Sequence, residues 1–175
     1  MKHIARIAVT TALALAGATA AQAQYYVEGA YTATRLKDEG EKIKPAMLTG
    51  VVGYGLHPHL AVEGMLGLGV KKGRFVDEDG LNEVKYKSAY GIYLKPRYQV
   101  TPELELFARL GYTQAKTKIN WQGGSSSDSD GSTSWGFGGN YTLDKNLYVT
   151  ASYMNFYKEG SVKIDGFNLG VGYKF

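Results

Sequence analysis

The chain contains no cysteine and only three histidines, and after its first residues it has no long apolar run. Without cysteine, an exported protein has no disulfide and needs either a good core or a membrane for its stability. After residue 23, no stretch approaches the roughly 18 apolar residues of a membrane-spanning helix. Glycine (23 residues) and tyrosine (14) are abundant instead, which favours tightly packed strands with interfacial aromatic side chains over helices.

Residues 1–23 have the pattern of a secretory signal peptide. Lys2 and Arg6 give a positive start, Ile7–Ala16 is apolar, and Ala21-Gln22-Ala23 is a small-x-small cleavage sequence. We expect cleavage before Gln24, which leaves residues 24–175 as one domain. The mature chain then keeps 18 of the 20 basic residues against 16 acidic ones, so its charge gives no argument for nucleic-acid binding.

The last ten residues, Gly166–Phe175, alternate strictly between apolar and small or polar side chains. Successive side chains of a strand point to opposite faces, so this segment has one large apolar face and one small or polar face. In water such a strand is exposed and prone to pair with other chains. In a bilayer the same pattern is that of a barrel strand with lipid outside and a filled lumen inside.

Seven upstream segments carry this alternation, although in the second of them apolar residues occupy both faces. Their predicted bounds are about 24–35, 45–55, 60–71, 83–98, 104–118, 134–143 and 147–157. Segments of about 9–11 residues are long enough to cross a bilayer as tilted strands. Pro96 is the exception within them, because proline cannot donate to a ladder, and we expect a bulge or the end of the strand there.

The connections alternate between short turns and longer polar loops. Short turns are expected near 56–59, 100–103 and 144–146. The long connections are charged or rich in Ser and Gly, and the third is expected to be a mobile loop over Asn120–Thr133. Outer-membrane barrels have this asymmetry, with short turns in the periplasm and long loops outside. The sequence therefore predicts an all-β fold, an eight-stranded antiparallel transmembrane β-barrel with an up-and-down meander.

Three stretches resemble the OmpA/OmpX-like small outer-membrane β-barrel family. They are Gly53-Tyr54-Gly55-Leu56-x-Pro58-x-Leu60-Ala61-Val62-Glu63-Gly64, Lys95-Pro96-Arg97-Tyr98-x-Val100-Thr101-Pro102-Glu103-Leu104 and Ala108-Arg109-Leu110-Gly111-Tyr112. The C-terminal Leu169-x-Val171-x-Tyr173-x-Phe175 resembles the aromatic-ended signal by which such barrels are recognised for assembly. The resemblance implies insertion by the barrel-assembly machinery into the outer membrane of a Gram-negative bacterium, in contact with lipid and lipopolysaccharide. It specifies the fold well and activity poorly, because the family mixes adhesins, structural proteins and members of unknown role.

The inward-facing positions of the predicted strands carry several charged residues. These are Glu28, Glu63, Lys95, Arg97, Glu105 and Arg109, with Lys174 as a further candidate. One interpretation is a gate or ion path, and the other is a salt-bridge network that plugs a narrow barrel. An eight-stranded barrel is just wide enough for side chains to fill it, and buried charges persist only when paired, which favours the plug.

The candidates for catalysis and metal binding are weak. His57 and His59 lie in a predicted periplasmic turn, with no cysteine or nearby acidic ligand to complete a metal site. Asp128-Ser129-Asp130-Gly131 hints at a calcium loop, but its further ligands are missing. The small barrels that trim or add lipid acyl chains need a base near the outer leaflet, usually histidine, and none is available there. We therefore expect no enzyme activity, no cofactor and no metal.

The sequence predicts a monomeric barrel that acts in surface interaction, such as adhesion to host surface or matrix proteins, or in envelope integrity. Its function is expected to reside in four loops, Leu36–Lys44, Lys71–Glu83, Ile119–Thr133 and Tyr157–Val162. A narrow channel is the main alternative, and a lipid A-modifying enzyme is a weaker one. A secreted lipocalin-like binder is also considered, but it requires apolar residues inside and charges outside, the reverse of this pattern.

Overall fold

The computed structural model describes residues 25–38, 41–43, 45–71, 73–77, 80–121, 124–159 and 162–175, and describes side chains over most but not all of these ranges. The chain forms only strands there, and no helix among these residues is long and apolar enough to cross a membrane. The strands are β1 (Tyr25–Asp38), β2 (Glu41–Ile43), β3 (Ala46–His57), β4 (Leu60–Lys71), β5 (Gly73–Asp77), β6 (Gly80–Gln99), β7 (Leu104–Trp121), β8 (Gly124–Thr142), β9 (Leu147–Glu159) and β10 (Val162–Lys174).

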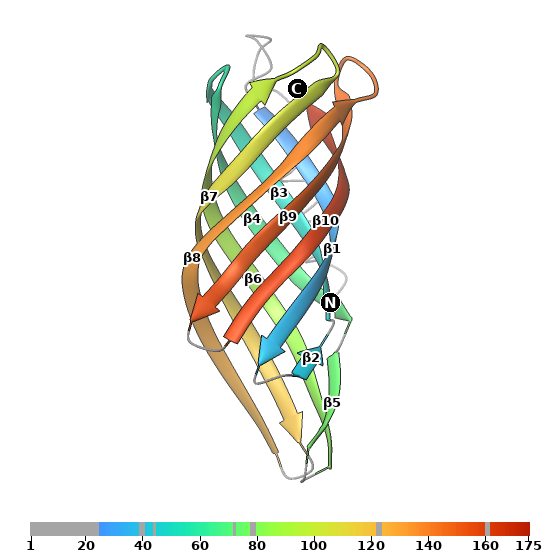
Figure 1. Ribbon diagram of the computed structural model, residues 1–175, viewed down its shortest axis with the longest axis vertical. Helices are drawn as coiled ribbons and strands as arrows, with labels where there is room; N and C mark the ends of the chain where they lie inside the picture. The colour runs from blue at the N-terminus through green and yellow to red at the C-terminus, as the bar shows by residue number, and fades with distance from the viewer. Residues whose placement is uncertain are drawn as a thin grey trace, which may run out of the picture.

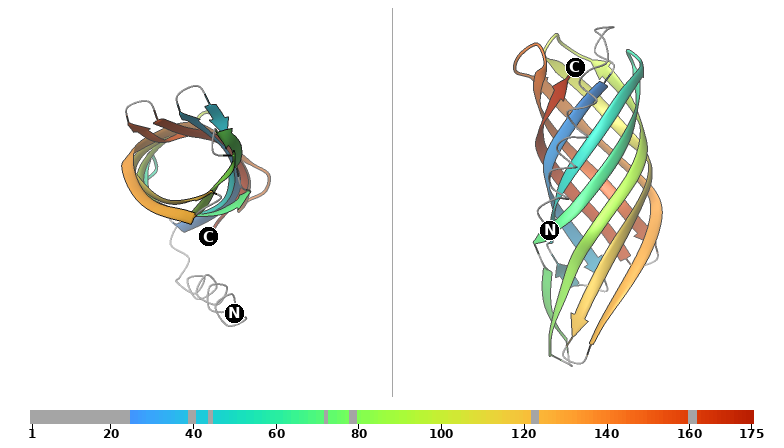
Figure 2. Two further views of the ribbon diagram at one scale, coloured as in Figure 1. Left: turned by 90° about the horizontal axis from the view of Figure 1, so that it is seen from below. Right: turned by 180° about the vertical axis from the view of Figure 1, so that it is seen from behind.

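The eight long strands close into an antiparallel barrel, as the sequence predicted. Neighbours in sequence pair with one another, and β10 returns to pair with β1 from Tyr26↔Lys174 to Lys37↔Lys163. The ribbon viewed along the barrel forms a closed ring (Figure 2, left). Closure leaves the barrel itself without an open edge, which is the requirement for a sheet that crosses a bilayer.

The alternation read from the sequence gives the two faces of the barrel. Large apolar side chains cover the outside, and 27 of those that the structure describes are between 37% and 70% exposed. In the C-terminal strand β10, Phe167, Leu169, Val171 and Tyr173 are all on this outer face. The inner face buries both polar and apolar side chains instead. This polarity contradicts the lipocalin-like alternative, because a soluble carrier would keep the apolar face inside.

Two predicted loops turn out to be largely strand. β1 continues to Asp38 and pairs with the short β2, so only part of 36–44 is a connection. Similarly, β5 pairs with the first residues of β6 from Gly73↔Val84 to Asp77↔Gly80. The charged residues and the glycine of each segment indicated a loop, but the backbone of each segment gains ladder hydrogen bonds from its partner strand.

The prediction of a loop at Asn120–Thr133 also needs correction. β8 begins at Gly124 and pairs with β7 without a register shift from Trp121↔Gly124 to Leu104↔Tyr141. The Ser-, Asp- and Gly-rich composition indicated a loop, but the continuous ladder with β7 holds this segment extended. The low-complexity stretch is therefore the outer part of a long hairpin.

Pro96 does not cause a bulge, and β6 runs past it to Gln99, so that prediction is wrong. Pro96 lies opposite Leu60 of β4, and Leu94↔Leu110 and Arg97↔Phe107 keep the same register with β7 on either side of it. The next residue, Arg97, donates its backbone N–H to the His59 carbonyl at 3.0 Å. The missing backbone donor of Pro96 therefore does not shift the register of β6 on either side of it.

The two ends of the barrel differ in length. At one end, short connections of a few residues join β3 to β4, β6 to β7 and β8 to β9. At the other end, β5, β6, β7 and β8 continue beyond the ends of β9 and β1 as a projecting sheet (Figure 1). β8 pairs with β9 only from Trp135 to Thr142, and beyond that point Ser134 Oγ donates to the Phe156 carbonyl at 3.0 Å.

Candidate functional site in the barrel lumen

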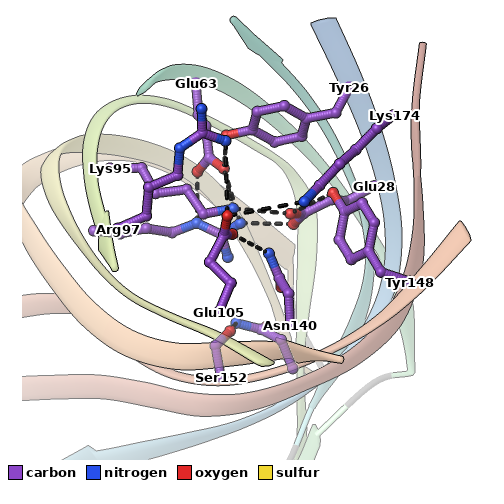
Figure 3. A network of polar contacts seen from close by, with 12 residues as sticks. Tyr26, Glu28, Glu63, Lys95, Arg97, Glu105, Asn140, Tyr148, Ser152 and Lys174 are labelled. Carbon is purple, nitrogen blue, oxygen red and sulfur yellow. Dashed lines mark hydrogen bonds and ion pairs between the residues drawn. The ribbon is translucent and has the colours of Figure 1, made fainter. Parts of the chain in front are cut away.

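The lumen contains an ionic cluster of two carboxylates and two cations. Glu28 comes from β1, Glu63 from β4, Lys95 from β6 and Arg109 from β7, each at an inward position of its strand. β4, β6 and β7 are neighbours in the sheet, whereas β3 separates β1 from β4. Figure 3 shows Glu28, Glu63 and Lys95 pointing toward one another from different strands.

The four charges of this cluster are mutually paired. Lys95 Nζ lies 3.1 Å from Glu28 Oε1 and 3.0 Å from Glu63 Oε1. Arg109 donates through Nη2 to Glu28 Oε2 at 2.6 Å and through Nε to Glu63 Oε2 at 2.5 Å. All four side chains are at most 6% exposed. Charges buried to this degree require partners, and the cluster has equal numbers of each sign.

Three aromatic residues surround the cluster. Tyr26 donates its hydroxyl to Glu63 Oε1 at 2.7 Å, and Tyr148 donates to Glu28 Oε1 at 3.0 Å. Lys95 Nζ also lies 4.3 Å from the centre of the Phe107 ring. All three rings are buried at inward positions of their strands, but the alternation of the sequence alone gives no indication that the two tyrosines bond to the carboxylates. That detail depends on the distance across the lumen, which only the closed barrel defines.

Arg97 and Glu105 belong to a second, looser cluster nearer the short-turn end. Arg97 Nη1 and Lys174 Nζ each lie 3.8 Å from Glu105 Oε2. Asn140 Nδ2 donates to Glu105 Oε1 at 2.8 Å, an interaction that the sequence did not suggest. Arg97 Nε also donates to the Pro58 carbonyl at 3.1 Å. The six charged residues singled out from the sequence are therefore divided between two clusters and do not form one network.

An apolar cluster fills the lumen beyond the ionic one. It consists of the buried residues Met47, Val51, Met65, Ala89, Tyr93, Met154 and Phe156. The lumen also contains cavities of about 20 Å³, a volume close to that of one water molecule. Charged, aromatic and methionine side chains thus occupy the interior in successive layers.

The histidines lie outside these layers. His57 and His59 are exposed in the turn between β3 and β4, and their rings are 5.6 Å apart. Among the side chains that the structure describes, no group of three His, Cys, Asp or Glu residues could hold a metal ion. The side chain of Asp128 is outside the described part of the chain, and Asp130 is exposed on β8.

A third charged group lies on the outer surface and was not noted in the sequence. Asp165 is buried between Arg35 and Lys163, with 3.6 Å to Arg35 Nε and 3.6 Å to Lys163 Nζ, and it accepts a hydrogen bond from Tyr153 at 2.7 Å. The Arg35 guanidinium lies 5.7 Å from the centre of the Phe167 ring. We call Arg35, Lys163 and Asp165 the outer ion cluster. In the alternation of their strands, these three residues occupy the same face as the lipid-facing residues. That alternation was the signal by which the sequence could have revealed the cluster.

Residues 6–175 match the outer membrane protein beta-barrel domain family. Among solved structures, the chain is similar to Ail, the attachment invasion locus protein of Yersinia pestis, with 24% identity over 87% of this chain and 98% of that chain and a TM-score of 0.65. It is also similar to Neisserial surface protein A (13% identity, 86% and 97% coverage, TM-score 0.68). The N-terminal β-barrel domain of Pseudomonas aeruginosa OprF is a third similar structure, with 18% identity over 87% of this chain and 98% of that chain and a TM-score of 0.61. At these identities the likeness concerns the fold alone.

Ail has also been solved in complex with the heparin analogue sucrose octasulfate. A search of curated protein sequences found no match. The family match covers nearly the whole chain, and the closed barrel with its apolar outer face agrees with it. The chain belongs to the outer membrane protein beta-barrel domain family of Gram-negative bacteria.

Proposed function

We propose that the protein is a non-catalytic surface-interaction protein whose partner binds the projecting sheet of β5–β8. The observation that carries this proposal is the length of these strands beyond the apolar belt. On β7, Tyr112 is the last large outward apolar side chain that the structure describes, and the strand continues to Trp121, a further distance of about 30 Å at the usual rise per residue. A structure whose only task was to span the bilayer would not need this extension.

The filled lumen supports surface interaction over conduction. The ionic cluster and the apolar cluster follow one another along the barrel axis, and the cavities near them have volumes of only about 20 Å³ each. The histidines of the mature chain, His57 and His59, lie at the end opposite to the projecting sheet. An acyl-transfer or acyl-hydrolysis site at the outer leaflet would therefore lack its usual base.

The charge of the four ranges that were predicted to be loops favours a protein partner with a basic surface. Together the ranges 36–44, 71–83, 119–133 and 157–162 contain seven basic and ten acidic residues. A polyanion such as a sulfated glycan would meet net repulsion there. Ail binds a heparin analogue, but by its loop charges this chain is a poor candidate for the same ligand.

The lipid partner is proposed to be lipopolysaccharide, contacted through the outer ion cluster. Arg35 and Lys163 are 43% and 35% exposed beside the lipid-facing Phe167, where cations can pair with headgroup phosphates. The double variant Arg35→Gln/Lys163→Gln should bind lipopolysaccharide-containing vesicles more weakly, by roughly fivefold for each charge removed. Equal binding of the variant and the parent protein would exclude this site.

The remaining sequence-based assignments are proposed with this function. Residues 1–23 act as a cleaved signal, and residues 24–175 form the outer-membrane domain, with the short turns in the periplasm. Leu169, Val171, Tyr173 and Phe175 present the signal that the barrel-assembly machinery recognises. All four of these side chains are exposed on the outer face, where another protein can reach them before insertion.

The test is attachment of cells that display the protein to host-cell surfaces and immobilised matrix proteins. The first variant replaces residues 117–128 with a tight turn, and its matched control keeps the length of that hairpin but permutes its sequence. Adhesion by the parent, and loss of it in both variants at equal surface levels, would support recognition of the hairpin's own sequence. If the parent adheres no better than empty cells, the adhesion proposal fails. Sensitivity of a deletion strain to detergent would then test envelope integrity.

A further inference from the structure

Three buried oxygen atoms in the lumen have no hydrogen-bond partner among the described residues. One is Asn140 Oδ1 on β8, beside Glu105. The other two are Thr150 Oγ1 on β9 and Asn168 Oδ1 on β10. Thr150 is 2% exposed and Asn168 is 8% exposed, so bulk water does not reach them freely. Buried polar atoms in folded proteins almost always have a partner, and each exception therefore needs a physical account.

Both residues line the same cavity of about 20 Å³, on the side of the ionic cluster that faces the apolar one. Glu28 and Ser152 also line it. Ala30 of β1 lines it as well, and in the register Gly170 lies between Ala30 and Thr150 of β9.

We propose that this cavity is a binding site for one ordered water molecule, held by Thr150 and Asn168 and linked to the Glu28 carboxylate. A cavity of this size accommodates one water, and a buried water typically makes about three hydrogen bonds. The hydroxyl of Thr150 can donate to the water, and the water can then donate to Asn168 Oδ1 and to Glu28. Ser152 Oγ already interacts with Asn168 Nδ2 at 3.0 Å, which fixes the orientation of the amide.

This water joins the ionic cluster to the β9–β10 side of the lumen. Tyr148 is the β9 residue that bonds directly to Glu28, and Lys95 and Arg109 approach from β6 and β7. With the water in place, Thr150 and Asn168 are connected to the same carboxylate. The ionic layer then extends around more of the barrel wall than the direct contacts alone provide.

A second cavity of the same volume supplies an internal control. It is lined mainly by apolar side chains, including Met47, Ala89, Ala115 and Ile164. A site of this composition offers too few hydrogen-bond partners to hold a water. A high-resolution crystal structure of the protein should therefore show a solvent peak within hydrogen-bond distance of both Thr150 and Asn168, and none in the apolar cavity. Absence of a peak at Thr150 and Asn168 would overturn the proposal.

The direction in which a substitution at Thr150 changes the stability tests the same inference. If Thr150 Oγ1 binds the water, Thr150→Val removes a hydrogen bond and should lower the urea midpoint of unfolding. If the hydroxyl is buried without a partner, the same change removes an unfavourable group and should raise the midpoint. Thr32→Val is the matched control, because Thr32 Oγ1 lies 3.2 Å from Thr49 Oγ1 and its removal must lower the midpoint. A raised or unchanged midpoint for Thr150→Val, with Thr32→Val lowered, would overturn the proposal.

Discussion

Removal of Arg109 provides the sharpest test of the ionic cluster. Arg109 makes three hydrogen bonds to Glu28 and Glu63, and its side chain is 6% exposed. Arg109→Met leaves two buried carboxylates with Lys95 as their remaining cation. Breaking a buried charge pair by removing one partner costs about 3–5 kcal/mol, because the other charge stays buried without compensation. We expect a decrease of this size in the free energy of unfolding.

The matched variant restores the charge balance. Glu63→Gln/Arg109→Met removes one charge of each sign and keeps the Lys95–Glu28 pair, whose atoms are 3.1 Å apart. Residues in one salt-bridge network show coupling of about 0.5–3 kcal/mol, so the double variant should cost less than the sum of the two single variants. The assay is urea unfolding of protein refolded into lipid vesicles, followed by tryptophan fluorescence.

Two results would refute this reasoning. One is a cost below about 1 kcal/mol for Arg109→Met, which is the range of exposed pairs and would mean that water solvates the carboxylates. The other is strict additivity in the double variant, which would mean that the two residues do not share an electrostatic network. Either result would remove the physical basis for treating this layer as a plug.

Further predictions concern the second cluster, the glycines and the assembly signal. Arg97→Gln should cost less than about 1 kcal/mol in the same unfolding assay, because its contact to Glu105 is 3.8 Å long and partly exposed; a cost equal to that of the buried cluster would contradict the assignment. Gly111→Ala should destabilise by about 1–3 kcal/mol, because a Cβ there overlaps backbone atoms of β6, whereas Gly64→Ala, with open space around it, should be within about 0.5 kcal/mol of the parent. Phe175→Ala should reduce the amount of barrel assembled in cells while refolding in detergent stays unchanged; equal loss in both assays would indicate a stability role. Single-channel recordings of the refolded parent should show no steady open level, and a stable conductance would revive the channel alternative.

The sequence determined most of the fold because its signal is local. Side-chain alternation has a period of two residues, and a one-residue slip would move every apolar side chain to the wrong face. The bounds predicted for the strand at 60–71 agree with the observed Leu60–Lys71, where one face is apolar throughout. The same rule failed at 124–133, because this Ser-, Asp- and Gly-rich sequence lacks the alternation, and its extended state depends on pairing with β7.

The lumen was determined only in part by the sequence. Parity assigned Glu28, Glu63, Lys95 and Arg109 to the inside, but parity cannot say which carboxylate meets which cation. Pairing across the lumen depends on strand tilt and stagger, which are fixed when β10 closes on β1. That closure brings Arg109 within hydrogen-bond distance of Glu28, a residue 81 positions away along the chain. Local periodicity thus gave the two faces of each strand, and the closed barrel alone decided which inward side chains touch.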